Sequence, residues 1–329
     1  MTALNAKMFM TPGDTKVAHV VPAQWGPYVD ILAMLKANGE LVYDTSDPAA
    51  LDPGGGGPGA VRVFWSLVEI PSGRSWAAVA VFAEALGDAS GGTDHLAEML
   101  PGHIEHWERF RVVVRNYDAV VVHTPAMAQR VRPFVNIPVF VVPLGWAPDV
   151  WGKRPADRPR HSHYDLAWWG SPVGRRVEIF PQLETWCSAQ GIRGVNLTGK
   201  FGRELIGTLD TVTAVVYVAH SKVASYSTWR LWQCLGADAP VISEPVGDGD
   251  AWPFTPDGDF TVVPWLDTLT AWSRLERAVA AARDGTLAST LPRRPSEMSP
   301  VKYTLDEVEF HFWRGVLTQA RLAFEAHYG

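Results

Sequence analysis

The chain has 329 residues, of which 47% are hydrophobic and 19% are charged, and its formal net charge is −6. This length allows two domains of ordinary size, and the composition is that of a soluble globular protein. The negative charge excludes a global basic surface for nucleic acid, although local basic patches remain open. No apolar run reaches the roughly 18 residues of a membrane-spanning helix, and the N-terminus lacks the apolar core of a signal peptide. We therefore expect a cytoplasmic protein.

The sequence gives little support for a metal site or a disulfide. Cys187 and Cys234 are the only cysteines, and neither belongs to a metal-spacing motif, which favours a reducing compartment. Asp248-Gly249-Asp250 lies in a Gly- and Pro-rich stretch that is typical of a surface loop rather than of a catalytic metal site. We expect no bound metal and no cofactor.

The first half alternates apolar runs with helical patterns, which is typical of a parallel α/β sheet. The segment around the Gly-rich stretch 53–59 is interpreted as a surface linker, because it lacks the GK[ST] ending of a phosphate loop. The elements predicted here are strands over 16–22, 61–68, 76–82, 117–124 and 139–142, and helices over 28–38, 96–116 and 125–131.

The second half repeats this alternation after a Pro- and Arg-rich segment, 153–160, where we place the domain boundary. We predict domains over 1–152 and 153–303, and a C-terminal helix, 304–329, that packs back on the first domain. The elements predicted here are strands over 164–169, 212–218, 240–242 and 260–263, a strand and turn over 195–200, and helices over 177–190, 228–235, 266–283 and 304–328.

The stretch 212–244 has the form strand, polar loop, helix, strand. Ligands of parallel α/β sheets bind at the carboxyl ends of strands and at helix N-termini. At that point this stretch has several hydroxyl side chains, Lys222 and Arg230, all of which suit a phosphate group.

Three stretches, taken in order, carry a resemblance to a known family. They are DAVVVHT (118–124) with VVPLGWAP (141–148), LAWWGS (166–171) with Arg175-Arg176, and STWRLWQCLGA (227–237) with VISE (241–244). The first is similar to the end of the first domain of GT-B glycosyltransferases, the second to the opening of their second domain, and the third to their donor motif. Within that fold, the chain resembles the family-4-like group that includes spore-maturation-type glycosyltransferases.

The resemblance implies an α/β protein of GT-B architecture, with two facing Rossmann-like domains and a C-terminal helix. It also implies a hexosyltransferase whose donor is a nucleotide sugar, with a UDP-sugar expected. Where the family has a glutamate that accepts both ribose hydroxyls, this chain has Gln233, whose amide retains one acceptor and gains a donor. The donor-binding residues that we predict are Gly170, Ser171, Arg176, Lys200, Lys222, Ser225, Ser227, Thr228, Arg230 and Gln233. Arg175 is a further candidate, and Ser227 or Thr228 also suits the cap of the helix.

An inverting transferase needs a general base on the first-domain side, whereas a retaining one does not need it in that role. Both outcomes stay open. We predict Asp94, His95 and His123 as catalytic residues, because they follow strands or lie in a Gly-rich loop. Glu84 is another candidate. His19 lies inside an apolar run and is interpreted as a core histidine.

Three other functions fit the same pattern. Gln233 favours a module that binds a nucleotide sugar or glycan without turnover. A nucleotide-sugar epimerase shares the two-domain build, although it usually has more acidic and histidine residues around the donor. A phage-type transferase acting on modified DNA would use a local basic strip, for which the chain offers Lys153, Arg154, Arg158 and Arg160. The acceptor is therefore a glycan, a small molecule or modified DNA.

Overall fold

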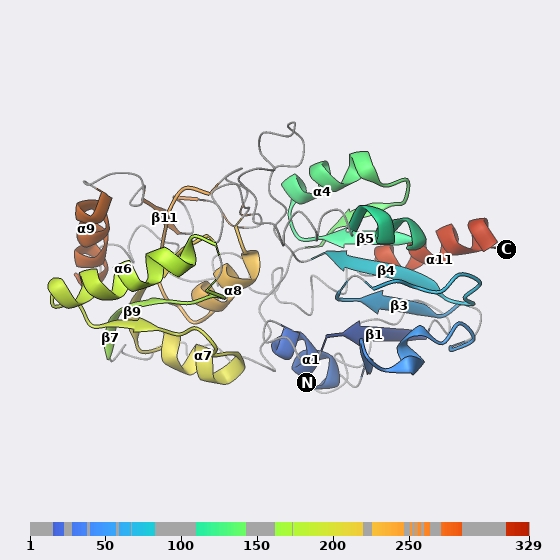
Figure 1. Ribbon diagram of the computed structural model, residues 1–329, viewed down its shortest axis with the longest axis horizontal. Coiled ribbons are helices and arrows are strands. Elements are labelled where there is room, and N and C mark those ends of the chain that lie inside the picture. Colours follow the sequence, from blue (N-terminus) through green and yellow to red (C-terminus); the bar gives the residue numbers. More distant parts are fainter. Residues whose placement is uncertain are drawn as a thin grey trace. The chain divides into compact units, whose positions relative to one another are not determined.

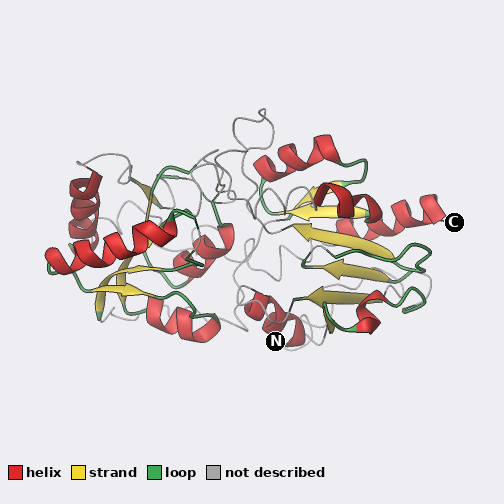
Figure 2. Cartoon of the chain, in the orientation of Figure 1, coloured by secondary structure: helices red, strands yellow, loops and turns green. Residues whose placement is uncertain are grey.

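The computed structural model describes residues 16–22, 28–37, 40–56, 59–66, 68–82, 110–142, 162–172, 174–219, 226–246, 251, 254, 256–257, 260–263, 271–284 and 314–328. They form two compact units, each built on one parallel sheet with helices beside it (Figures 1 and 2). The α/β fold class predicted from the sequence is confirmed. The change from one sheet to the other falls between residues 142 and 162, and the predicted linker 153–160 lies outside the described residues.

The first unit has a sheet in the order β2-β1-β3-β4-β5-β6, with every neighbouring pair parallel. Its strands are β1 (Val17–Val21), β2 (Leu41–Asp44), β3 (Val61–Phe64), β4 (Ala77–Phe82), β5 (Ala119–Val122) and β6 (Val139–Val141). Its described helices are α1 (Val29–Ala37), α4 (Pro125–Val131) and α11 (Arg314–Tyr328), with 3₁₀ turns η3 (Pro48–Leu51), η4 (Val114–Asn116) and η5 (Arg132–Phe134).

Helix α11 lies near the end of the sequence but belongs to the first unit, because it packs against β3, β4 and β5. A buried ion pair lies in the same region, where Arg74 Nη2 is 2.7 Å from Asp118 Oδ2. The guanidinium of Arg74 also lies over the ring of Phe324 in α11, with 5.5 Å between its carbon and the ring centroid. This cation–π contact joins the C-terminal helix to the sheet.

The second unit has a sheet in the order β11-β10-β9-β7-β8, again entirely parallel. Its strands are β7 (Tyr164–Trp168), β8 (Gly194–Asn196), β9 (Val212–Tyr217), β10 (Val241–Ser243) and β11 (Thr261–Val262). Its described helices are α6 (Arg176–Ala189), α7 (Gly202–Leu209), α8 (Thr228–Gly236) and α9 (Ala271–Arg283). None of the helices within the described ranges of either unit is long and apolar enough to cross a membrane.

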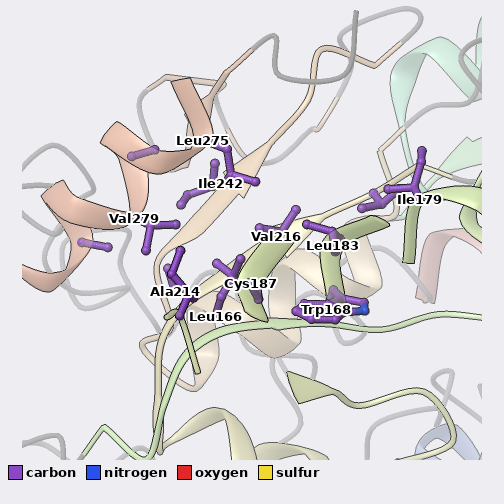
Figure 3. Close-up of a cluster of buried hydrophobic side chains, with 14 of the residues drawn as sticks. Leu166, Trp168, Ile179, Leu183, Cys187, Ala214, Val216, Ile242, Leu275 and Val279 are labelled. Atoms are coloured by element: carbon purple, nitrogen blue, oxygen red, sulfur yellow. The ribbon is translucent and has the colours of Figure 1, made fainter. Parts of the chain in front are cut away.

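One face of the second sheet shares a core with α6 and α9 (Figure 3). Successive side chains of a strand point to opposite faces, so Leu166 and Trp168 of β7 join this core together with Ala214 and Val216 of β9. Leu183 of α6 is completely buried among them. The residues between these, such as Val215 and Tyr217, therefore face the opposite side of the sheet, where α8 contacts β10.

Asp165 of β7 is buried, and its carboxylate connects β7 to the segment before β8 and to α9. Its Oδ2 accepts hydrogen bonds from the backbone N of Arg193 at 2.8 Å and from Arg193 Nε at 3.1 Å. Arg283, at the end of α9, contributes a second ion pair at 3.1 Å. Desolvation opposes ionisation, but the hydrogen bonds from Arg193 and Arg283 outweigh it and lower the pKa of Asp165 to about 2. The carboxylate therefore stabilises the fold only while it is ionised.

We expect Asp165→Asn to lower the free energy of unfolding by about 1–3 kcal/mol at pH 7, because two charge-assisted contacts are lost. The pKa is depressed in the folded state, so this stabilisation is complete above about pH 4 and is lost as pH falls through about 2. Urea unfolding of both proteins across this range measures the difference. Asp284→Asn, which changes an exposed acid beside the same helix, is the control. A difference that stayed constant down to pH 2 would contradict the assignment.

Candidate anion site at the switch point of the second sheet

The strand order of the second unit itself indicates where a ligand binds. β7 pairs with β8 on one side and with β9 on the other, so the chain connections leave in opposite directions from this pair. In open parallel sheets, such a switch point leaves a crevice outside the carboxyl ends of the two strands. The residues at that edge are Gly170, which follows β7, and Val218 and Ala219, which follow β9.

Two arginines converge on Gly170 from different helices. Arg176 is the first residue of α6, and Arg230 lies in the first turn of α8. A Cβ built on Gly170 would lie 2.7 Å from Arg176 Nη1 and 2.7 Å from Arg230 Nη2. Gly170 also has a φ of +139°, a conformation that L side chains rarely adopt. The backbone conformation therefore favours glycine here, and any side chain would displace the two guanidiniums that share the space beside it.

Arg176 is held firmly in this position. Its side chain is buried, and its Nε donates a hydrogen bond of 2.9 Å to the carbonyl oxygen of Val218 at the end of β9. Burial and the neighbouring charge of Arg230 lower the pKa of Arg176 to about 9, whereas Tyr217 and Glu244 act in the opposite direction. At neutral pH Arg176 is therefore a desolvated cation beside a second cation, an arrangement that costs free energy.

Arg230 is partly buried. Burial lowers its pKa, and its guanidinium carbon lies 5.8 Å from the centroid of the Tyr217 ring. Within the residues that the structure describes, neither Arg176 nor Arg230 forms an ion pair with a carboxylate. Both also lie in the first turns of helices, where the helix dipole already favours negative charge. The pair is thus an electropositive site suited to an anion.

Arg175, the neighbour of Arg176, has a different partner. Its Nη2 donates a hydrogen bond of 2.9 Å to Glu244 Oε2, while Glu244 Oε1 accepts one of 3.1 Å from the backbone N of Ala219. Glu244 is buried and follows β10. It therefore fixes the end of β9 and neutralises Arg175, which leaves Arg176 and Arg230 as the cations of the site. The sequence places Glu244 at the end of the donor motif, but only the structure reveals that it pairs with Arg175.

The other predicted donor residues have different places in the second unit. Ser171 follows Gly170 and is exposed. Thr198 Oγ1 donates a 3.0 Å hydrogen bond to the carbonyl oxygen of Gly170, which brings the turn after β8 to the same edge. Lys200, two residues further on, forms an ion pair with Glu204 of α7. Gln233 is buried and lies one turn after Arg230 on α8.

The start of α8 lacks the side-chain capping hydrogen bond that Ser227 or Thr228 suggested in the sequence. Ser227 occupies the N-cap, but its side chain makes no capping hydrogen bond, and Thr228 is the first helical residue. The backbone N of Ser227 instead donates to the hydroxyl of Tyr217 at 2.7 Å. Lys222 and Ser225, which the sequence also predicts as donor residues, lie outside the described residues.

The predicted catalytic residues belong to the first half of the chain, and only His123 is described. Asp94, His95 and the candidate Glu84 lie outside the described residues. His123 follows β5 and is buried, with Nδ1 2.9 Å from the carbonyl oxygen of Val142. Because a carbonyl only accepts, Nδ1 carries the hydrogen and Nε2 carries a lone pair. Burial lowers the pKa of His123 to about 4, so the imidazole is neutral at pH 7.

His19 is a core histidine, as its apolar surroundings in the sequence predict. It is completely buried in β1, and its Nδ1 accepts a 3.1 Å hydrogen bond from Trp65 Nε1. Burial lowers the pKa of His19 to about 3, so it stays neutral at physiological pH. In the part of the chain that the structure describes, no group of His, Cys, Asp or Glu side chains is arranged to hold a metal ion.

No protein-family model matches the sequence, and no curated protein does either. Solved structures do match the fold. TarM of S. aureus, solved with UDP and alpha-GlcNAc-glycerol, superposes with a TM-score of 0.52 at 8% identity, over 79% of this chain and 56% of TarM. The pneumococcal O-GlcNAc transferase GtfA, solved with UDP and GlcNAc, gives a TM-score of 0.53 at 10% identity, over 80% of this chain and 57% of GtfA. The chain thus spans just over half the length of these two proteins.

A third solved structure is similar over its whole length. The UDP-forming alpha,alpha-trehalose-phosphate synthase from Burkholderia xenovorans gives a TM-score of 0.55 at 11% identity, over 94% of this chain and 100% of the synthase. At these identities the likeness establishes the fold. The chain has the GT-B fold of glycosyltransferases, as the resemblance predicts.

Proposed function

We propose that the chain is a glycosyltransferase that moves a sugar from a UDP-sugar to an acceptor hydroxyl. The observation that carries this proposal is the pair of arginines beside Gly170. Arg176 and Arg230 are desolvated, repel each other and lie in the first turns of two helices at a switch point. A structure maintains such a costly arrangement where an anion offsets it, and a diphosphate supplies charge for both guanidiniums.

The same arrangement suits the chemistry of glycosyl transfer. As the bond between the sugar and the diphosphate breaks, negative charge grows on the departing phosphate oxygen. Cations that are already positioned stabilise this charge more in the transition state than in the bound donor, which lowers the barrier. Gly170 allows the backbone to approach the donor closely, because it has no side chain to fill the space beside the arginines.

The solved neighbours support the nucleotide. TarM and GtfA were solved with UDP, and the trehalose-phosphate synthase is described as UDP-forming. We propose UDP as the leaving group here as well, with Gln233 near the ribose. We further propose that the two arginines carry the phosphate charge without a bound metal. His123, Asp94 and His95 remain the predicted candidates for the base that receives the proton of the acceptor, which is a glycan or another hydroxyl compound.

Two measurements test the proposal: binding of UDP and UDP-sugars, and then hydrolysis of a UDP-sugar. We expect UDP and UDP-sugars to raise the thermal midpoint of the purified protein, with about 2.7 kcal/mol of added stability at one hundred times Kd. Slow hydrolysis of one UDP-sugar, unchanged by EDTA, is expected to follow. Binding without any hydrolysis or transfer would favour the non-catalytic module, and no stabilisation by any nucleoside diphosphate would contradict the proposal.

We expect Arg230→Gln to change stability and binding in opposite directions. Without ligand, the variant should be more stable by about 0.5–1 kcal/mol, because a cation leaves both the helix N-terminus and the neighbourhood of Arg176. The affinity for UDP should fall at least about tenfold, because a charge-assisted contact is lost. Thermal unfolding with and without UDP measures both. Arg203→Gln, in the first turn of α7, is the control and should keep its UDP affinity. Lower stability together with unchanged affinity would show that Arg230 is structural.

Gly170→Ala should displace both guanidiniums, because its methyl group would lie 2.7 Å from an Nη atom of each. We expect a folded protein, destabilised by about 1–3 kcal/mol, whose affinity for UDP is at least about tenfold lower. Gly191→Ala is a matched control, since Gly191 also has a positive φ of +64°, but a Cβ at this position would meet no atom of the described residues within 4 Å. Equal losses of UDP affinity in both variants would mean that the contact with the arginines is irrelevant.

A further inference from the structure

Tyr217 links β9 to the start of α8 at the anion site, and no prediction from the sequence assigns it a role. It is the last residue of β9 and is 4% exposed. Its hydroxyl accepts the 2.7 Å hydrogen bond from the backbone N of Ser227, ten residues further along the chain. The guanidinium of Arg230 lies 5.8 Å from the centroid of its ring. One side chain thus contacts both the start of α8 and the arginine in its first turn.

The hydrogen bond to Ser227 satisfies a donor that the helix itself leaves open. The first four N–H groups of a helix have no partner within it. In a capping box, a Glu or Gln at the third helical position accepts from the N–H of the N-cap residue. Here the third position is Arg230, whose guanidinium has only donors. The hydroxyl of Tyr217 takes over that acceptor role, which leaves the third position for a cation.

The ring of Tyr217 also acts electrostatically on Arg230. Burial lowers the pKa of Arg230, and its guanidinium lies over the Tyr217 ring. The face of a neutral aromatic ring attracts a cation. This contact partly offsets the desolvation of Arg230.

We propose that Tyr217 is a positioning residue of the anion site, which holds the N-terminus of α8 so that Arg230 stays beside Gly170. The inference rests on the proposed function for the identity of the anion, a nucleoside diphosphate. The placement of α8 by Tyr217 is a property of the free protein and is measurable without any ligand.

The first experiment uses the free protein. Tyr217→Phe keeps the ring beneath Arg230 but removes the acceptor for the N–H of Ser227. We expect backbone amide exchange at Ser227 and in the first turn of α8 to become about tenfold faster, because this end of the helix opens more often. Tyr226→Phe is the matched control, since it removes another buried hydroxyl whose bond goes to the carbonyl oxygen of Glu244. Unchanged exchange at Ser227 in Tyr217→Phe would overturn the inference.

The second experiment separates positioning of Arg230 from general loosening. We expect Tyr217→Phe to weaken UDP binding about five- to twentyfold in calorimetry, with uridine affinity unchanged, because only the phosphate contact depends on Arg230. Introduced into Arg230→Gln, the same change should weaken UDP binding less than about twofold, since the residue through which it acts is gone. Additive effects, equal losses for UDP and uridine, or a UDP affinity like that of the wild type would each overturn the inference.

The two experiments also distinguish this inference from the proposed function. If the wild-type protein binds neither UDP nor a UDP-sugar, the proposed function fails, whereas the exchange measurement still decides whether Tyr217 holds α8. If the wild-type protein binds UDP and Tyr217→Phe binds it equally well, the proposed function stands and the inference fails.

Discussion

Repulsion between two guanidiniums is the constraint on which the candidate anion site of the second unit depends. Arg176 and Arg230 both approach Gly170, and no carboxylate among the described residues forms an ion pair with either of them. The surrounding structure holds them in place with neutral groups. The carbonyl oxygen of Val218 accepts from Arg176, and the ring of Tyr217 lies beneath Arg230. Neutral partners restrain the cations without cancelling their charge, so the charge remains available to a ligand.

The nearby carboxylate forms its ion pair with a third arginine. Glu244 is buried at the edge of the site, and its charge favours the charged form of Arg176. It accepts hydrogen bonds from Arg175 and from the backbone N of Ala219. A buried charge without a partner is costly, so the Arg175–Glu244 pair both satisfies the carboxylate and anchors the end of β9. Adjacent arginines in the sequence thus have separate surroundings: Arg175 is paired with a carboxylate, and Arg176 belongs to the candidate anion site.

Much of the fold follows from the sequence, because the parallel sheets are built from short, β-branched apolar runs between amphipathic helices. The predicted limits of α4 and α8 agree closely with the structure, since Pro125 begins the first and Gly236 ends the second. The sequence patterns do not predict one strand and one α-helix that the structure describes. Strand β2, Leu41–Asp44, is a partly exposed edge strand beside a polar segment. Helix α7, Gly202–Leu209, contains two glycines in only two turns, although Leu205, Ile206 and Leu209 have helical spacing.

The residue types of the candidate site are evident in the amino-acid sequence, since glycine, arginines and hydroxyls at strand ends indicate a phosphate ligand without any coordinates. Which of these residues act together depends on the folded chain. Arg176 and Arg230 are 54 positions apart, and Arg175 is as good a candidate by type. The strand order and the places where the helices begin bring Gly170, Val218 and Tyr217 to one edge of the sheet. This arrangement selects Arg176 rather than Arg175 for the site. Such long-range contacts arise from packing that no local pattern encodes.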